Sequence, residues 1–168
     1  VSESNLKAVE AYYLEFLGLL NSHFETHDFI LGDSPTLGDC ALMGPLYAHL
    51  YLDPYAGRIM REQAPQVCSW AERLRHAEPV STSYIDDGDD LPKSLLPILC
   101  HLGREYTPVL ATAMPLLQAW LRDNPHGDMP LYVGKHKFTL GKGTPYEAES
   151  MRSIMIFEGW KVQRLMDL

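Results

Sequence analysis

Two histidines are the first side chains in this sequence whose spacing could do chemistry. His23 and His27 lie four residues apart, so in a helix both imidazoles would face one side and could share a metal ion. The acidic run at residues 86–90 likewise suggests calcium, but it lacks the alternating ligands and the distal Glu of an EF-hand loop. Because the sequence places no third ligand near the histidines, we interpret them as a surface pair at an exposed helix end. We predict no metal site, and we expect the acidic run to be a solvated loop that caps a helix.

Two further clusters contain the residue types that phosphate binding or proton transfer requires. Residues 141–144 read Gly-Lys-Gly-Thr, but His136 stands where a phosphate-binding loop has its first Gly, so we expect a turn into the last helix. His101, Arg104 and Glu105 fall within about one helical turn, a spacing more typical of a surface pair with one partly buried member than of an acid–base site. We therefore interpret neither cluster as a catalytic site.

Aromatic side chains are the remaining candidates for a binding site. Tyr47, Tyr51 and Tyr55 follow one apolar helical run, and Trp70 and Tyr106 come later in the chain. A small-molecule pocket needs apolar and aromatic walls with a few polar tips, whereas the same rings can also fill a core, as we expect for Trp70. Because tyrosine favours places where one end stays in water, we expect a minority of the tyrosines to line a cleft.

Composition limits the class of protein. The 168 residues suffice for one domain with a substantial core, and 46% hydrophobic with 21% charged residues is ordinary for a soluble globular protein. The net charge of -8 argues against nucleic acid or an anionic membrane as a partner. Cys40, Cys68 and Cys100 are widely spaced in apolar helical runs. This spacing predicts three buried thiols in a reducing cytoplasm rather than a disulfide framework or a zinc site.

The pattern of apolar residues predicts the helices that would position these side chains. The first helix should run over residues 5–27, and a second, apolar on most sides and therefore buried, over residues 40–52. A short helix should follow over residues 55–63, and Pro65 suits the first position of the next one. The inward stripe predicted for the first helix consists of Leu6, Val9, Tyr13, Phe16, Leu17, Leu20 and Phe24.

A long helix and then a small hairpin are predicted for the second half. Asp90 can cap this helix, and Pro108 and Pro115 should each kink or split it, which leaves one bent helix and two helices open. Strands over residues 131–133 and 136–140 should flank a turn at Gly134-Lys135. The stripe of the long helix is predicted to be Leu95, Leu99, Leu102, Tyr106, Val109, Ala113, Leu117 and Trp120. A final helix opened by Thr144 or Pro145 would carry Met151, Ile154, Met155, Val162, Leu165 and Met166.

A turn followed by a reinforced helix start is the most specific local pattern. Gly32-Asp33-Ser34-Pro35 leads into Thr36-Leu37-Gly38-Asp39 and then into the apolar run. Thr36 can accept a hydrogen bond at the N-cap, and Asp39, three residues on, can accept one from the backbone N–H of Thr36. The Asp39 carboxylate would also lie at the positive end of the helix dipole. We expect Thr36 and Asp39 to have this structural role.

This pattern resembles the capping box that opens the buried sixth helix of soluble glutathione S-transferases, in the order Gly-x-x-apolar-Ser/Thr-x-x-Asp. Residues 43–50 (Met-Gly-Pro-Leu-Tyr-Ala-His-Leu) and 64–74 (Ala-Pro-Gln-Val-Cys-Ser-Trp-Ala-Glu-Arg-Leu) resemble bacterial members of that superfamily. The likeness covers roughly residues 6–121. Pro35 and Cys40 depart from it, since the family usually pairs two larger apolar residues there as a hydrophobic staple.

The resemblance implies an all-α fold of the transferase C-terminal type over residues 1–124, with the hairpin and last helix appended over residues 125–168. It also implies a thioredoxin-like domain that binds glutathione and activates its thiol. No part of this chain reads as that domain, and the chain opens without an initiator Met, so we expect the helical second half of a larger protein, inactive alone and without a catalytic residue. The implied partner is a small electrophilic substrate, and its contacts would be Tyr47, Tyr51, Tyr106 and Arg104.

Two partner predictions follow from the resemblance. A homodimer is implied, with Tyr12, Leu14 and Leu19 of the first helix available as contacts outside its inward stripe. The alternative is a non-catalytic interaction or assembly module, because the same helical fold resembles domains of translation factors and synthetase complexes. A thioredoxin-like segment upstream would favour the enzyme, and its absence from the gene would favour the module.

Overall fold

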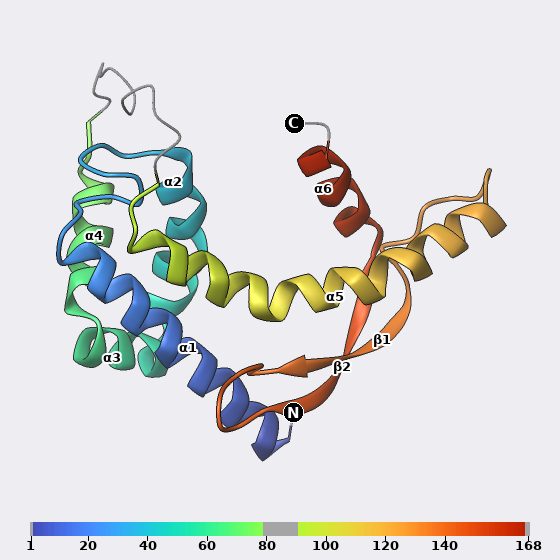
Figure 1. Cartoon of the computed structure of the whole chain (residues 1–168), viewed down its shortest axis with the longest axis horizontal. Coiled ribbons are helices and arrows are strands. Elements are labelled where there is room, and N and C mark those ends of the chain that lie inside the picture. Colours follow the sequence, from blue (N-terminus) through green and yellow to red (C-terminus); the bar gives the residue numbers. More distant parts are fainter. Residues whose placement is uncertain (1, 79–90, 167–168) are drawn as a thin grey trace. The chain divides into compact units, whose positions relative to one another are not determined.

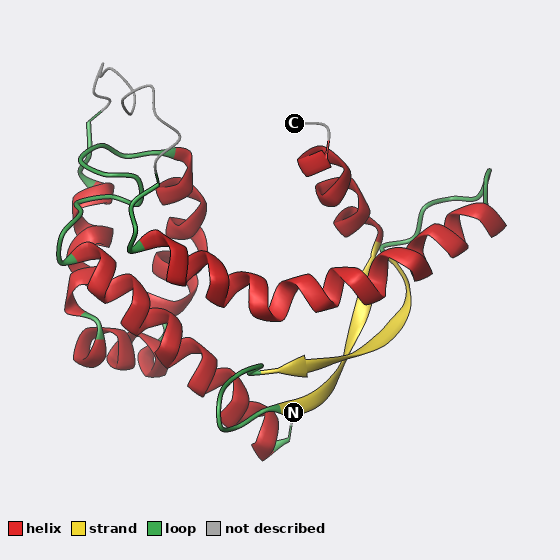
Figure 2. Ribbon diagram, in the orientation of Figure 1, coloured by secondary structure: helices red, strands yellow, loops and turns green. Residues whose placement is uncertain are grey.

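A computed structural model describes residues 2–78 and 91–166 and forms helices with one small antiparallel hairpin (Figures 1 and 2). The prediction of a helical bundle with an appended hairpin and a final helix is confirmed. The acidic run and the Asp90 cap lie outside the described residues. In chain order the elements are α1 (Glu3–Phe24), α2 (Leu37–Met43), the π-helix η1 (Gly44–Tyr51), α3 (Pro54–Gln63), α4 (Pro65–Arg75), α5 (Leu95–Asp123), β1 (Tyr132–Leu140), β2 (Ala148–Met155) and α6 (Ile156–Met166).

The chain forms two compact units. The helical unit comprises Tyr13–His101, and the hairpin unit comprises Val1–Tyr12 together with Leu102–Leu168. Helices α1 and α5 each contribute one part to each unit. The sequence also predicts a domain boundary at residue 124, which refers to the extent of a family domain and not to a compact unit. That boundary stays a prediction.

The core of the helical unit follows from helical spacing. Leu17, Leu20 and Phe24 recur at intervals of three and four in α1 and are at most 4% exposed. The Phe24 ring stacks on Trp70 of α4 with centroids 5.1 Å apart, and Trp70 is fully buried, as expected. Helices α3 and α4 begin at prolines, where the missing N–H costs nothing, so the two predicted helices are confirmed.

The N-terminal part of α1 differs from its prediction. Leu6 and Val9 are 58% and 51% exposed, and the fully buried residue is Ala8. Ala8 packs under the turn at Gly141, where a Cβ added to the glycine would lie only 2.8 Å from the Ala8 carbonyl oxygen. The backbones approach so closely that a small side chain faces inward and the larger ones face away. The helix also ends at Phe24, short of residue 27.

The second predicted helix is present without a break, but it is not α-helical throughout and is not buried on most sides. It begins at Leu37, and from Gly44 it continues as a π-helix. Only Asp39 and Leu46 are buried along α2 and η1. Cys40 and Cys100 are exposed and Cys68 is half-buried, so the prediction of three buried thiols is also wrong. Small apolar residues permit burial but do not require it, and this explains both errors.

Helix α5 is one helix of 29 residues that contains both Pro108 and Pro115. Of its predicted stripe, Leu95, Val109, Ala113 and Leu117 are buried. Leu99, Leu102 and Tyr106, in contrast, are between 39% and 45% exposed. Thus the alternative of two helices is excluded, and the stripe is only partly inward.

The hairpin is larger than predicted, and its turn lies elsewhere. Strand β1 runs through Gly134 without a turn, and the chain reverses at residues 141–147, where Gly141 and Gly143 have φ of 63° and 83°. These left-handed conformations strongly favour glycine, whereas the φ of Gly134 is not positive. The last helix begins at Ile156, so residues 148–155 form strand β2 instead of helix. His136 pairs with Arg152, and Phe138 with Ser150, across the ladder.

A fully buried carboxylate joins three segments of the helical unit. Asp39 Oδ2 accepts hydrogen bonds from the Thr36 backbone N–H (2.9 Å) and from the Thr36 hydroxyl (2.7 Å) at the N-cap of α2. Asp39 Oδ1 accepts from the Ile30 N–H and from Trp70 Nε1, each at 2.9 Å. The carboxylate therefore fixes the start of α2 against the preceding turn and against α4.

Asp39→Asn should destabilise the protein by about 3 kcal/mol, because the amide nitrogen would face two donors and leave them buried without an acceptor. Asp53→Asn is the matched control. The exposed Asp53 caps α3 by accepting from the Tyr55 and Ala56 N–H groups, and Asn is nearly as good an N-cap, so we expect a loss below about 1 kcal/mol. Urea unfolding of both variants measures the difference. Equal losses would contradict a special role for Asp39.

Candidate functional site

Two predicted binding residues, Tyr47 and Tyr51, lie one turn apart on η1 in the helical unit. Their rings stack with centroids 5.5 Å apart, and both side chains are half-buried. The guanidinium of Arg75 lies 5.2 Å from the Tyr47 ring centroid, and that of Arg61 lies 5.2 Å from the Tyr51 centroid. The structure thus places these tyrosines in an aromatic cluster covered by two cations.

The other two predicted binding residues, Tyr106 and Arg104, belong to the hairpin unit. Tyr106 lines a cavity in that unit. Arg104 is not one of the cavity's lining residues, and its guanidinium lies 5.9 Å from the Tyr12 ring centroid and against Gly143. The four predicted residues are therefore divided between the two units, and one of them reaches the cavity.

The cavity of the hairpin unit is open to solvent on one side and has a volume of about 640 Å³, within the range of roughly 300–1,000 Å³ usual for small-molecule sites. One wall is a face of α5, and the opposite wall comes from the inward side of the hairpin. The lining residues are Tyr12, Leu102, Gly103, Glu105, Tyr106, Val109, Phe138, Leu140 and Arg152. The lining combines apolar and aromatic side chains with the charged Glu105 and Arg152, a composition usual for small-molecule binding sites.

Two charged side chains reach the cavity, and each has a partner. Arg152 forms a close ion pair with the buried carboxylate of Glu158, and its guanidinium lies 6.0 Å from the Tyr106 ring centroid. Glu105 Oε1 accepts a hydrogen bond of 3.0 Å from the Gly141 N–H. Burial raises the pKa of the Glu105 carboxyl, although this hydrogen bond, Arg104 and Arg152 oppose the rise.

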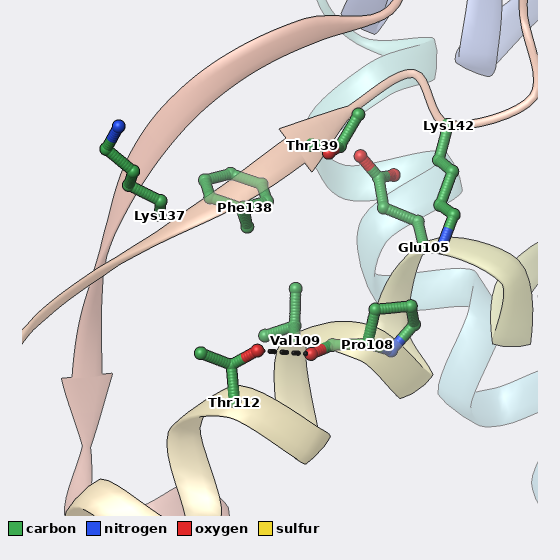
Figure 3. Close-up of a pocket in the computed structure, with 8 residues that line it drawn as sticks. All are labelled: Glu105, Pro108, Val109, Thr112, Lys137, Phe138, Thr139 and Lys142. Atoms are coloured by element: carbon green, nitrogen blue, oxygen red, sulfur yellow. Dashed lines mark hydrogen bonds between the residues drawn. The ribbon is translucent and has the colours of Figure 1, made fainter.

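A smaller pocket of about 170 Å³ shares Glu105, Val109 and Phe138 with the cavity. Figure 3 shows its other walls, where Lys142 extends beside Glu105 and the Thr112 hydroxyl donates to the Pro108 carbonyl at 3.0 Å. Its second lysine, Lys137, is paired with Glu149 at 2.9 Å. This pocket is too small for a drug-sized molecule and extends the polar edge of the larger cavity.

The predicted surface histidines are not both at the surface. His23 is fully buried, its Nδ1 lies 2.9 Å from the Ser94 hydroxyl, and its ring stacks on His27 at 4.7 Å. Helix α1 ends at residue 24 and the chain folds back over it, so that His23 Nε2 lies 3.4 Å from the Phe29 carbonyl. The residues that the structure describes include no group of three or more His, Cys, Asp or Glu placed to hold a metal ion.

His101 likewise differs from the expected surface pair. It is 2% exposed, stacks on Phe16 at 5.7 Å, and its Nδ1 lies 3.6 Å from Glu15 Oε1. Sequence reasoning also missed the hairpin residues of the cavity, namely Phe138, Leu140 and Arg152. Their signal was the alternation of inward residues along β1 and β2, which a hairpin with its turn at residue 141 would have revealed.

The first pH prediction concerns His23, whose pKa is lowered from 6.5 chiefly by burial. The unfolded chain therefore takes up the proton first, so the stability that the neutral imidazole supports is present above pH 6.5 and is lost as the pH falls below it. In His23→Gln the loss of stability between pH 7 and pH 5 should be smaller than in the wild type. His76→Gln, at an exposed histidine, should keep the wild-type slope. Urea midpoints across this range supply the measurement, and an unchanged slope in His23→Gln would contradict the prediction.

The second pH prediction concerns Glu105. The pKa of the Glu105 carboxyl is raised above 4.5 in the folded protein. Its contribution to folding stability is therefore fully present below pH 4.5 and is lost as the pH rises through the raised pKa. Glu105→Gln should therefore lose less stability than the wild type between pH 4.5 and pH 7, with a gain at neutrality of no more than about 1 kcal/mol after solvent screening. Glu147→Gln is the control, since exposed Glu147 accepts from Gly143 N–H in the same turn. Melting temperatures against pH test this, and identical profiles for both variants would refute it.

A comparison with known protein families gives a match in the N-terminal part of the chain. Across residues 2–78 and 91–166, none of the helices combines the length and hydropathy needed to cross a bilayer. No curated protein and no solved structure gives a significant match. Residues 1–78 match the family model of the glutathione S-transferase C-terminal domain, a segment that includes Asp39, Tyr47 and Tyr51 and ends before α5. The chain is thus similar to that domain from α1 through α4.

Proposed function

We propose that this chain is the helical, substrate-binding domain of a glutathione S-transferase-like protein. The observation that carries the proposal is the family match over residues 1–78, and the buried Asp39 within the matched segment supports it. Thr36 and Asp39 are assigned a structural role as the cap of α2, because both oxygens of Asp39 are occupied by donors of the chain itself.

In this proposal the chemistry belongs to two domains. A thioredoxin-like domain would bind glutathione and lower the pKa of its thiol, and the thiolate would attack a small electrophile. This chain would supply contacts to the electrophile from its helical unit, where Tyr47 and Tyr51 are the candidates, and would be inactive alone.

A homodimer in the cytoplasm is part of the same proposal. Helix α1 carries the exposed apolar side chains Leu6, Val9 and Leu14, and Leu37 at the start of α2 is 88% exposed. A second copy or the thioredoxin-like domain would remove such side chains from water. Leu19, in contrast, packs against the core of the helical unit and is a poor candidate for the contact.

The second candidate is a non-catalytic assembly module of the same fold. One observation favours it. Phe157 and Trp160 on α6 stack at 5.1 Å while remaining 52% and 55% exposed, and exposed aromatic pairs are common in protein interfaces.

The test uses the complete gene product, assayed for conjugation of glutathione to 1-chloro-2,4-dinitrobenzene. We expect conjugation, and Tyr47→Ala should raise the KM for the electrophile by about tenfold while leaving the KM for glutathione unchanged. The control is Tyr55→Ala, because Tyr55 is an exposed tyrosine of the neighbouring helix α3. If the protein neither conjugates this electrophile nor is retained on immobilised glutathione, the transferase proposal fails and the assembly module is favoured.

A further inference from the structure

We propose that the cavity of the hairpin unit is a complete binding site for an uncharged, mainly aromatic small molecule. The inference goes beyond the proposed function, because every lining residue belongs to this chain and all except Tyr12 lie outside the matched segment. Such a site requires neither glutathione nor a second domain.

The walls of the cavity select an apolar ligand. Leu102, Tyr106 and Val109 follow one another at helical spacing and form one face of α5. Between them, a Cβ added to Gly103 would have only the Thr107 hydroxyl within 4 Å, which leaves room for a ring. Phe138 and Leu140, two residues apart on β1, form the apolar part of the opposite wall.

The hairpin is held on the helices independently of any ligand. The Gly141 N–H donates to Glu105, and the Gly141 backbone lies directly against Ala8. At the far side of the turn, Asn5 Nδ2 donates to the Ser150 hydroxyl at 3.3 Å. Because these contacts fix both strands of the hairpin, the cavity is formed before a ligand arrives, and binding costs little ordering of the chain.

The charges around the cavity disfavour an ion as the ligand. The positive charge of Arg152 is already balanced by Glu158, so an anion would gain little from Arg152 and would also approach Glu105. A cation would lie against Arg152 after losing its hydration. An uncharged ring system avoids both the loss of ionic hydration and the repulsion by a like charge, and it can pack against the apolar walls.

The test compares two fluorescent probes with the same rings, N-phenyl-1-naphthylamine and its sulfonated counterpart 1-anilinonaphthalene-8-sulfonate. Titration of the purified protein in the absence of glutathione should give one saturable site for the neutral probe. The sulfonated probe should bind that site at least tenfold more weakly. Equal or tighter binding of the sulfonate would overturn the assignment of an uncharged ligand.

A matched pair of variants locates the probe. Leu102 and Leu121 are both on α5 and both 39% exposed, but only Leu102 lines the cavity. Leu102→Glu should weaken the neutral probe by about tenfold or more, since it places a carboxylate in the apolar wall, and Leu121→Glu should leave its affinity within twofold. Far-ultraviolet circular dichroism checks that both variants fold.

Every outcome bears on the site separately from the transferase proposal. No saturable binding of the neutral probe, or equal weakening by Leu102→Glu and Leu121→Glu, would overturn the site whether or not the gene product conjugates glutathione. Conversely, selective loss in Leu102→Glu would support the site even if no transferase activity exists. Should Leu102→Glu fail to fold, Leu102→Ala replaces it, and unchanged affinity together with unchanged stoichiometry would then count against the site.

Discussion

The buried carboxylate of Asp39 is the interaction on which the helical unit depends. A charge with no access to water is tolerated only when hydrogen bonds replace its hydration, and both oxygens of Asp39 have two donors. These donors come from the preceding turn, from the N-cap of α2 and from the indole of Trp70. One side chain therefore sets the position of α2 relative to α4, and the apolar core of Leu17, Leu20 and Phe24 packs around that arrangement.

Local signals allowed much of the helical unit to be predicted. Two of these signals depend on neighbouring residues only, namely a proline at the start of a helix and the hydrogen bond between the Thr36 N–H and the Asp39 carboxylate. The structure contains both. Burial depends on residues distant in sequence, and there the predictions were less accurate. His23 is buried because the chain folds back at Phe29, and Cys40 is exposed because nothing in the described chain covers that side of α2.

The cavity also depends on residues that are distant in sequence, so only part of it could be predicted. Tyr106 is a candidate from the sequence because a tyrosine hydroxyl favours contact with water, and Tyr106 lines the cavity. The hairpin wall is hard to recognise in the sequence because Gly134-Lys135 has the composition of a turn, whereas the reversal uses the left-handed backbone of Gly141 and Gly143. A shift of the turn by seven residues converts the predicted start of the last helix into strand β2 and brings Arg152 opposite His136. The position of one turn thus decided whether the site could be recognised.

The close approach of Gly141 to Ala8 limits how this protein can change during evolution. Position 141 must combine a left-handed backbone with the absence of a side chain, and position 8 already holds the smallest side chain that has a Cβ. Enlarging either residue would push the hairpin away from α1, and no substitution at the other could compensate fully. We therefore expect homologues that retain the hairpin to keep a glycine paired with alanine or glycine here, while lineages that lose the hairpin should vary freely at position 8.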